Sequence, residues 1–290
     1  MILGTFQYRE RIFPGVIEEE EVYDLSETAG QYPKSSADLR DFLAGEDALA
    51  KLKKGKASLL GSGIVYKLSK VRVMAPLLRP GKIICIGWNY SKHADEAGSE
   101  LPEEPVFFNK FATSIIGPQA PIVLPAISKQ VDYEAELAVV IGKRGKRIPE
   151  EAAMEYVAGY TAFNDISARD LQFRDQWVKG KALDTFAPLG PFLVTQEEVP
   201  DPHNLRIRLL LNGEVMQDAS TGMMIFKIPT LISFLSQFFT LEPGDIIATG
   251  TPEGVGFTRD PQVLLKPGDR VTVSIERVGE LSNPVVGESY

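Results

Sequence analysis

Short apolar runs, broken by glycine, proline and asparagine, recur from about residue 80 onward and limit what this chain can fold into. Runs of this length bounded by turn formers are typical of strands, whereas helices need longer periodic segments. Asn212-Gly213 follows one run directly and predicts a hairpin. The sequence therefore predicts a mostly β domain, with strands over Tyr133 to Ile141, Val157 to Phe163, Leu205 to Leu211, Asp245 to Ala248 and Arg270 to Val278.

The first part of the chain has a mixed pattern. Residues 1 to about 30 alternate in the manner of short strands. The stretch from Ser36 has the apolar spacing of a helix, which we expect Gly55 to end. Val65 to Met74 is expected to form a further strand, and the prolines and glycine after it place a domain boundary near residue 78.

These patterns predict an α+β protein of two parts. Residues 1–78 are expected to form a small N-terminal α+β domain, and residues 79–290 a larger, β-rich domain. Within the second part, Phe226 to Phe239 is expected to form an interrupted helix that starts at Pro229.

The composition removes several classes of function. Acidic residues outnumber basic ones, 39 to 31, so the net charge is −8 and no cationic surface exists for nucleic acid. No apolar stretch reaches the about 18 to 20 residues of a membrane span, and the first residues lack a signal-peptide pattern, so we expect a cytoplasmic protein. One cysteine, Cys85, and two histidines, His93 and His203, exclude disulfides and a thiolate or three-histidine zinc site. Any metal site must use oxygen ligands.

Two acidic residues interrupt the apolar alternation of Tyr133 to Ile141. Alternate residues of a strand share a face, so Glu134 and Glu136 stand side by side, about 6 to 7 Å apart at the backbone. They could be the solvated face of an amphipathic strand, or they could converge on a cation. The same face continues with apolar residues, and Asp165 ends a run that could form the neighbouring strand. Three carboxylates suit Mg²⁺ or Mn²⁺, with Ca²⁺ possible, in a site open to water and substrate.

The segment after Asp165 has the pattern of a capping box, Ser167-Ala-Arg-Asp170. It predicts a short helix that would place Arg169 and Gln172 on the same rim as Asp165. Spacing alone equally allows Arg169 to be an ordinary surface cation.

Several segments of the catalytic region are specific when taken together: Ile83 to His93, Asp132 to Glu136, Asn164 to Asp170, Lys179 to Lys181 and Thr249 to Gly256. In this order, over about residues 80 to 280, they resemble the fumarylacetoacetate hydrolase superfamily. The resemblance implies a catalytic domain built as a mixed β-sandwich roll and a homodimer. Asn89, where some members have an acidic residue, favours the short acylpyruvase or oxaloacetate decarboxylase-like branch with three acidic ligands.

The resemblance also implies roles for individual residues. The implied ligands of a divalent cation, usually Mg²⁺ or Mn²⁺, are Glu134, Glu136 and Asp165. The implied residues around the substrate are Lys181, beside the metal, and Arg169, Gln172, Gly250 and Thr251, which line the pocket.

His93 and Glu96 are one helical turn apart, so the carboxylate could orient the imidazole as a general base. A lone histidine in a loop would otherwise be an ordinary surface residue. Family hydrolases use such a pair on a segment that closes over the ligand, and the resemblance implies the same role here. His203 lies in a proline-rich turn without such a partner, and we expect it to be exposed.

These residues favour enolate chemistry on a 2-oxo acid. Cleavage beyond C3 leaves a pyruvate enolate that a cation and Lys181 can stabilise, with His93 activating water. Hydrolysis of an acylpyruvate or fumarylpyruvate is therefore the first choice. The same enolate serves oxaloacetate decarboxylation and isomerisation of 2-hydroxyhepta-2,4-diene-1,7-dioate, and the motifs do not separate the three. A non-catalytic, metal-stabilised ligand-binding dimer is the alternative of another class, which the intact His93, Glu96 and Lys181 disfavour.

Overall fold

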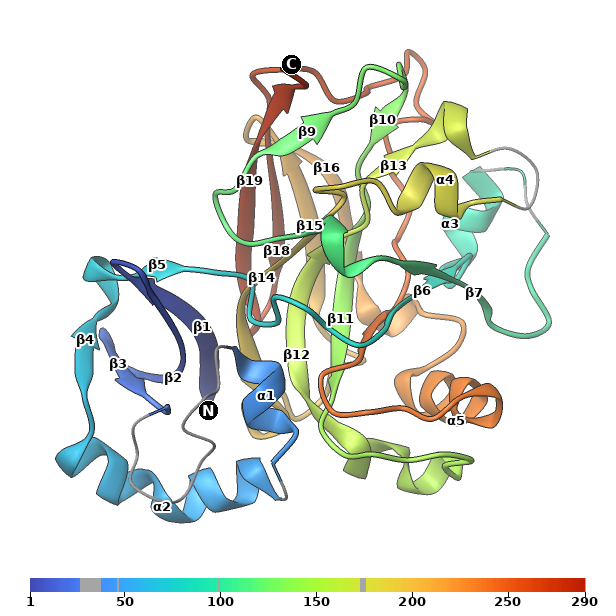
Figure 1. Ribbon diagram of the computed structural model, residues 1–290. Coiled ribbons are helices and arrows are strands. Elements are labelled where there is room, and N and C mark those ends of the chain that lie inside the picture. Colours follow the sequence, from blue (N-terminus) through green and yellow to red (C-terminus); the bar gives the residue numbers. More distant parts are fainter. Residues whose placement is uncertain (27–37, 46, 97, 99, 173–175, 290) are drawn as a thin grey trace.

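The computed structural model in Figure 1 describes residues 1–26, 38–45, 47–96, 98, 100–172 and 176–289. It confirms an α+β chain that is rich in sheet and has few helices. In the described part of the chain, no helix is long and apolar enough to cross a membrane.

A long sheet runs through the whole molecule. Its spatial order is β4 (Val65–Lys67), β3 (Glu21–Asp24), β2 (Arg11–Glu18), β1 (Ile2–Tyr8), β14 (Ala187–Thr195), β12 (Val157–Asn164), β11 (Ala135–Ile141), β17 (Ile246–Ala248), β6 (Ile83–Gly87) and β7 (Val106–Lys110). Two short strands join it at the side, β5 (Arg72–Val73) on β1 and β8 (Ile115–Ile116) on β14.

A second sheet packs on part of the first. Its order is β16 (Glu214–Ser220), β15 (Arg206–Leu211), β18 (Arg270–Ile275), β19 (Gly279–Gly287) and β9 (Ile122–Leu124). A separate pair is formed by β10 (Val131–Asp132) and β13 (Ser167–Ala168). The predicted hairpin is confirmed, since Asn212 and Gly213, both at positive φ, connect β15 to β16.

The alternation along β11 divides its side chains between two cores, as the pleat of a strand requires. Leu137 and Val139 join the cluster that β15 and β18 complete with their own buried residues. Ala138 and Val140 belong to the cluster on the opposite face, which also contains Phe42 of α1 (Leu39–Leu43). Burying a side chain such as Phe42 stabilises the fold by about 1.5–3 kcal/mol, so the N-terminal region is held to the sheet by packing.

The helix predicted from Ser36 to Gly55 is two helices in the structure, α1 and α2 (Ala48–Ser62), and Ser36 lies outside the described residues. The Asp38 side chain caps α1 by accepting from the Arg40 and Asp41 amides. α2 continues past Gly55 because Leu52 and Leu59 extend its buried face, which outweighs the about 1 kcal/mol that a helical glycine costs.

The predicted boundary near residue 78 interrupts neither the sheet nor the core. β1 pairs with β14, through Ile2 with Val194 and Leu3 with Leu193, so the N-terminal strands extend the main sheet. In Figure 1 these strands lie to the left, with α2 below them. The division into two domains stays a prediction.

Two further elements differ from expectation. The strand predicted over Val65 to Met74 is broken by a 3₁₀ turn at Leu68–Lys70 between β4 and β5. The predicted interrupted helix is the continuous α5 (Ile228–Phe238), in which Pro229 sits in the first turn, where its missing N–H costs nothing.

Candidate metal centre and active site

Glu134, Glu136 and Asp165 come together where β11 begins and β12 ends. Ala135 is the register partner of Asn164, so Asp165 follows directly beside Glu134, and its N–H donates to the Glu134 carbonyl at 2.9 Å. One oxygen from each carboxylate lies within 4.8 Å of the others, and all three residues are buried. Their burial excludes the solvated-face interpretation of the glutamates, whereas their role as metal ligands stays a prediction.

The regular backbone pairing of β11 does not include Glu134. The Glu134 N–H donates to Asn164 Oδ1 at 3.1 Å, and the Ala135 N–H donates to Gln217 Oε1 at 2.9 Å. These amide side chains take the place of a neighbouring strand for two buried donors. The strand predicted from Tyr133 therefore begins at Ala135.

Two buried lysines face the carboxylates. Lys181, in α4 (Val178–Lys181), donates from Nζ to Glu134 Oε2 at 2.7 Å and to Asp165 Oδ2 at 2.9 Å. Lys110, at the end of β7, forms an ion pair with Asp165 and donates to the carbonyls of Ile166 at 2.9 Å and Phe186 at 2.7 Å. The sequence arguments missed Lys110, and its one local signal is a charge at the end of an apolar strand.

The carboxylates are electrostatically unequal. Burial, with the nearby charges of Asp165 and Glu134, raises the pKa of Glu136 well above its usual range. Burial also opposes ionisation of Glu134, but Lys181 and then Arg169 outweigh it and lower the pKa of Glu134 to about 2. Crowded oxygen donors of this kind fit a hard divalent cation, whose charge relieves their mutual repulsion.

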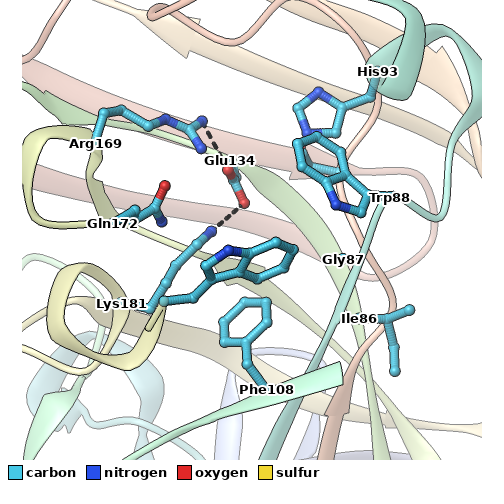
Figure 2. A pocket seen from close by; sticks show the side chains of 11 residues that line it. Ile86, Gly87, Trp88, His93, Phe108, Glu134, Arg169, Gln172 and Lys181 are labelled. Carbon is cyan, nitrogen blue, oxygen red and sulfur yellow. Dashed lines mark hydrogen bonds and ion pairs between the residues drawn. The ribbon is translucent and has the colours of Figure 1, made fainter. Parts of the chain in front are cut away.

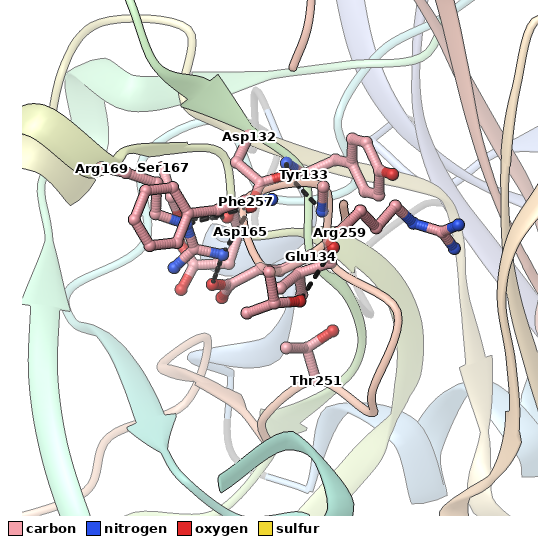
Figure 3. Close-up of polar contacts among 12 residues, drawn as sticks. Asp132, Tyr133, Glu134, Asp165, Ser167, Arg169, Thr251, Phe257 and Arg259 are labelled. Atoms are coloured by element: carbon pink, nitrogen blue, oxygen red, sulfur yellow. Dashed lines mark hydrogen bonds and ion pairs between the residues drawn. The ribbon is translucent and has the colours of Figure 1, made fainter. Parts of the chain in front are cut away.

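Arg169 is held by a carboxylate that sequence reasoning left without a role (Figure 3). Its Nε and Nη2 donate to Asp132 Oδ2 at 3.0 and 2.9 Å, and Nη2 lies 2.7 Å from Glu134 Oε1. Asp132 also accepts from the N–H groups of Gly256 at 2.8 Å and Phe257 at 3.0 Å. Because the Arg169 side chain is only 11% exposed, it is not an ordinary surface cation.

The predicted capping box is wrong. Ser167 lies in β13, and its hydroxyl donates to the Asp165 carbonyl at 2.9 Å instead of capping a helix. The following residues, Arg169–Leu171, form a 3₁₀ turn without a side-chain cap. Asp170 accepts instead from the Ser128 hydroxyl at 2.6 Å. Pairing of β13 with β10 takes the place of the expected helical start.

A cavity of about 220 Å³ opens at Glu134, the one carboxylate of the three that lines it (Figure 2). The residues predicted for the site that line it are His93, Glu134, Arg169, Gln172, Lys181 and Thr251. Its aromatic walls, Trp88, Phe108 and Trp177, were not foreseen from the sequence.

Gly250 and Thr251 have different positions. The Gly250 N–H donates to Glu136 Oε2 at 2.9 Å, so this glycine holds a carboxylate and is not among the cavity-lining residues. Gly250 has φ +96°, a conformation that glycine adopts without strain. Thr251 lines the cavity, and its hydroxyl accepts from Gln217 Nε2 at 2.9 Å. Gln217 thereby connects the cavity wall to the start of β11.

The His93 and Glu96 pair is present in α3 (Ser91–Glu96). Nδ1 of His93 lies 2.8 Å from Glu96 Oε1, and Glu96 Oε2 accepts from the Gly254 N–H at 2.9 Å. Burial raises the pKa of Glu96, but the hydrogen bonds from His93 and Gly254 outweigh it and lower that pKa. The imidazole is buried and stacks on Trp88 with ring centroids 5.4 Å apart. Figure 2 shows the two side chains next to each other. The ring is therefore oriented, with Nε2 left for the cavity it lines.

The expectation of an exposed His203 is wrong. The side chain is half-buried, and its Nε2 accepts from the Ile228 N–H at 3.1 Å. It thus satisfies a donor at the first residue of α5. The partner lies on a distant segment, which the sequence pattern around His203 does not reveal.

Comparison with known proteins gives a consistent result. The family described as fumarylacetoacetate hydrolase C-terminal matches residues 82–286. Oxaloacetate tautomerase fahd2, mitochondrial, from Xenopus laevis is 49% identical over 258 residues, which cover 88% of this chain and 80% of the relative.

Two solved structures cover 100% of this chain and are themselves covered in full. Maleylpyruvate hydrolase from Sphingobium sp. SYK-6, in complex with manganese(II) ion and pyruvate, has a TM-score of 0.83 at 33% identity. The 2-hydroxyhepta-2,4-diene-1,7-dioate isomerase from Mycobacterium marinum has a TM-score of 0.77 at 34% identity.

The comparison corrects one prediction from the sequence. The expectation of a cytoplasmic protein is contradicted, because the Xenopus relative is named mitochondrial. The absence of a recognisable signal peptide was a weak basis for that expectation, since targeting segments differ in pattern between compartments.

Proposed function

Because this chain belongs to the fumarylacetoacetate hydrolase family, we propose that it is a metal-dependent enzyme that interconverts the keto and enol forms of oxaloacetate. The observation that carries this proposal is that one cavity contains both an oriented imidazole, His93, and a buried ammonium, Lys181. His93 can accept a proton, and the Lys181 ammonium can stabilise the negative charge on the enolate oxygen. The name of the Xenopus relative favours tautomerisation among the enolate reactions.

The size of the cavity suits a small acid. At about 220 Å³ it lies below the about 300–1,000 Å³ that is usual for larger ligands. Arg169 and Lys181 supply positive charge for the substrate carboxylates, while Gln172 and Thr251 supply neutral hydrogen-bonding groups. This combination supports a short 2-oxo diacid as substrate.

The chain's own residues divide the proton transfer between them. A cation held by Glu134, Glu136 and Asp165 would act as a Lewis acid on the 2-oxo acid. Glu96 holds Nδ1 of His93, so Nε2 is the atom that takes a proton from C3 of the keto form. The Lys181 ammonium, fixed between two carboxylates, hydrogen-bonds to the oxygen on C2 and gives it a proton as the C3–H bond breaks, which completes the enol. The His93 imidazolium then returns its proton to Lys181 through solvent, so the net change is one proton moved from C3 to the C2 oxygen. No water is consumed and no carbon-carbon bond breaks.

Hydrolysis of an acylpyruvate remains the second candidate. The buried His93, paired with the partly exposed Glu96, is also suited to activating water, and the Sphingobium structure is named a hydrolase. The two reactions share the enolate and differ in whether water attacks a distal carbonyl. Product analysis therefore separates them.

The test follows the decay of enol-oxaloacetate absorbance with Mg²⁺, with Mn²⁺ and with a chelator, while pyruvate and carbon dioxide are measured in parallel. We expect faster enol loss than in buffer with metal, a return to the buffer rate after chelation, and neither product. The Glu136→Gln variant is the matched control for free metal in solution.

The same preparation is then given acetylpyruvate and fumarylpyruvate. Pyruvate release from these acids, with no effect on oxaloacetate, would assign hydrolysis instead. Carbon dioxide release from oxaloacetate would assign decarboxylation. A protein that binds metal and is inert toward the whole panel would be a ligand-binding protein of this family.

A further inference from the structure

A second hollow lies next to the active-site cavity. It has a volume of about 480 Å³, and we call it the β7 hollow because it is lined by 106–109 of β7 and by 176–178. Phe108 and Trp177 line both this hollow and the active-site cavity. The two spaces therefore share an aromatic wall.

Close packing fixes the Trp177 indole in this wall. Its ring meets Phe108 edge-on at 5.5 Å between centroids and meets Trp88 edge-on at 5.7 Å. A Cβ added at Gly87 would lie 2.6 Å from an atom of the indole, so the ring lies directly against the backbone there. Although Trp177 is partly exposed, its contacts with Gly87, Trp88 and Phe108 leave the ring little freedom to swing aside.

The wall stands beside the groups expected to act on the substrate. The Lys181 ammonium lies 5.1 Å from the centroid of the Phe108 ring, and Trp88 connects Trp177 to the stacked His93. A substrate held between Lys181 and His93 thus has the wall at its side, and any added substituent that points there meets Phe108 and Trp177.

We propose that Trp177, with Phe108, is a partition that sets the maximum length of the 2-oxo acid that the site accepts, and that the β7 hollow is an extension closed off by it. The inference rests on the proposed function in taking a 2-oxo acid as the ligand. A short diacid fits on the near side of the partition, whereas a longer chain needs the space beyond it.

Trp177 is the residue to change, because Phe108 contacts the catalytic Lys181 and its loss would disturb the ammonium directly. Trp177→Ala removes the partition, and Trp177→Phe retains an aromatic ring in it. Phe107→Ala is a matched control, since Phe107 lines the β7 hollow but is not among the residues of the active-site cavity. It enlarges the hollow without opening the wall.

The experiment measures dissociation constants by calorimetry, in the presence of Mn²⁺, for unbranched 2-oxo acids from pyruvate to 2-oxooctanoate. One methylene group that a confined pocket cannot accommodate weakens binding affinity by about tenfold or more. We expect the wild type, Trp177→Phe and Phe107→Ala to reject the longer acids. Trp177→Ala should bind 2-oxooctanoate at least about tenfold more tightly than the wild type does, and the ratio of its dissociation constants for 2-oxooctanoate and pyruvate should fall by a similar factor.

An unchanged length preference in Trp177→Ala, or an equal gain in Phe107→Ala, would overturn the partition while leaving the proposed function in place. Failure of the wild type to bind pyruvate with Mn²⁺ would overturn both. Should Trp177→Ala fail to fold, Trp177→Leu opens the same wall with a smaller loss of apolar contact and is judged by the same comparison.

Discussion

Lys110 and Asp165 form an ion pair in which neither side chain is exposed to solvent. Burial lowers the pKa of Lys110, because a charge in the interior is poorly solvated. Asp165 favours the charged form and opposes this effect without cancelling it. The two carbonyls that also accept from Lys110 give the ammonium a complete set of partners. Lys110 therefore holds Asp165, one of the three predicted metal ligands, in position.

Replacing this lysine is expected to destabilise the protein. Lys110→Met leaves Asp165 with Lys181 as its one remaining lysine partner, and removing one partner of a buried pair costs about 3–5 kcal/mol. Lys53→Met is the control, because its pair with Glu197 is exposed and such pairs contribute about 0–1 kcal/mol. Urea denaturation of the metal-free proteins gives both values. Equal losses in the two variants would contradict the structural role of Lys110.

Neutralising one carboxylate of the predicted metal site should separate metal binding from folding. Glu136→Gln is expected to lose most Mn²⁺ affinity and activity while keeping the fold, because the amide still offers an oxygen to the Gly250 N–H. Glu134→Gln should lose Mn²⁺ affinity in the same way, and it should also lower stability, because Lys181 and Arg169 each lose a charged partner. Calorimetric titration with Mn²⁺ and circular dichroism provide the two readouts, with exposed Glu280→Gln as control. Unchanged Mn²⁺ affinity in both variants would refute the assignment of these ligands.

The oriented imidazole makes a kinetic prediction. His93→Ala should lower turnover in the keto–enol interconversion of oxaloacetate by about a hundredfold or more, the effect of losing a general base, while Mn²⁺ affinity stays the same. Glu96→Ala should lower it less, because the imidazole remains but is no longer oriented. Any decarboxylation should be affected least, since it needs neither removal of the C3 proton nor activation of water. Near-wild-type turnover in both variants would remove the pair from the mechanism.

His203 predicts a pH dependence of stability away from the active site. Burial, and then the charge of Lys227, lower the pKa of His203 below its usual 6.5. The unfolded chain therefore takes up the proton first, so stability is lost as the pH falls from about 6.5 toward the folded value. Protonation also removes the acceptor for the Ile228 N–H.

The measurement compares melting temperatures of the wild type and His203→Asn between about pH 7.5 and 5.5. We expect the wild type to lose more stability than the variant as the pH falls, because the asparagine does not titrate. Parallel curves would show that His203 makes no contribution.

The sequence was sufficient for features that repeat locally. The alternation that places Glu134 and Glu136 on one face also marks β11, and a neighbouring run supplied Asp165. The resemblance correctly identified the family, as the match over residues 82–286 shows. Such signals need only the period of a strand or a fixed motif.

Features formed by distant segments were missed. Asp132 holds Arg169 across 37 positions, and the ring of Trp177, which precedes α4, packs against Gly87 of β6. No local pattern encodes these contacts, since they depend on how the strands are ordered in the sheet. The capping box failed for the same reason, because pairing of β13 with β10 overrode a local helical preference.

The pairing of β1 with β14 has a consequence for solubility. β14 lies between β1 and β12, so its backbone donors and acceptors face a partner on each side over the paired residues. A fragment trimmed to the family match would expose that side of β14 as an unprotected edge, together with apolar surface that now packs on Phe42. Bare edges recruit strands from other molecules. The N-terminal region thus covers an edge of the main sheet that would otherwise be open to pairing.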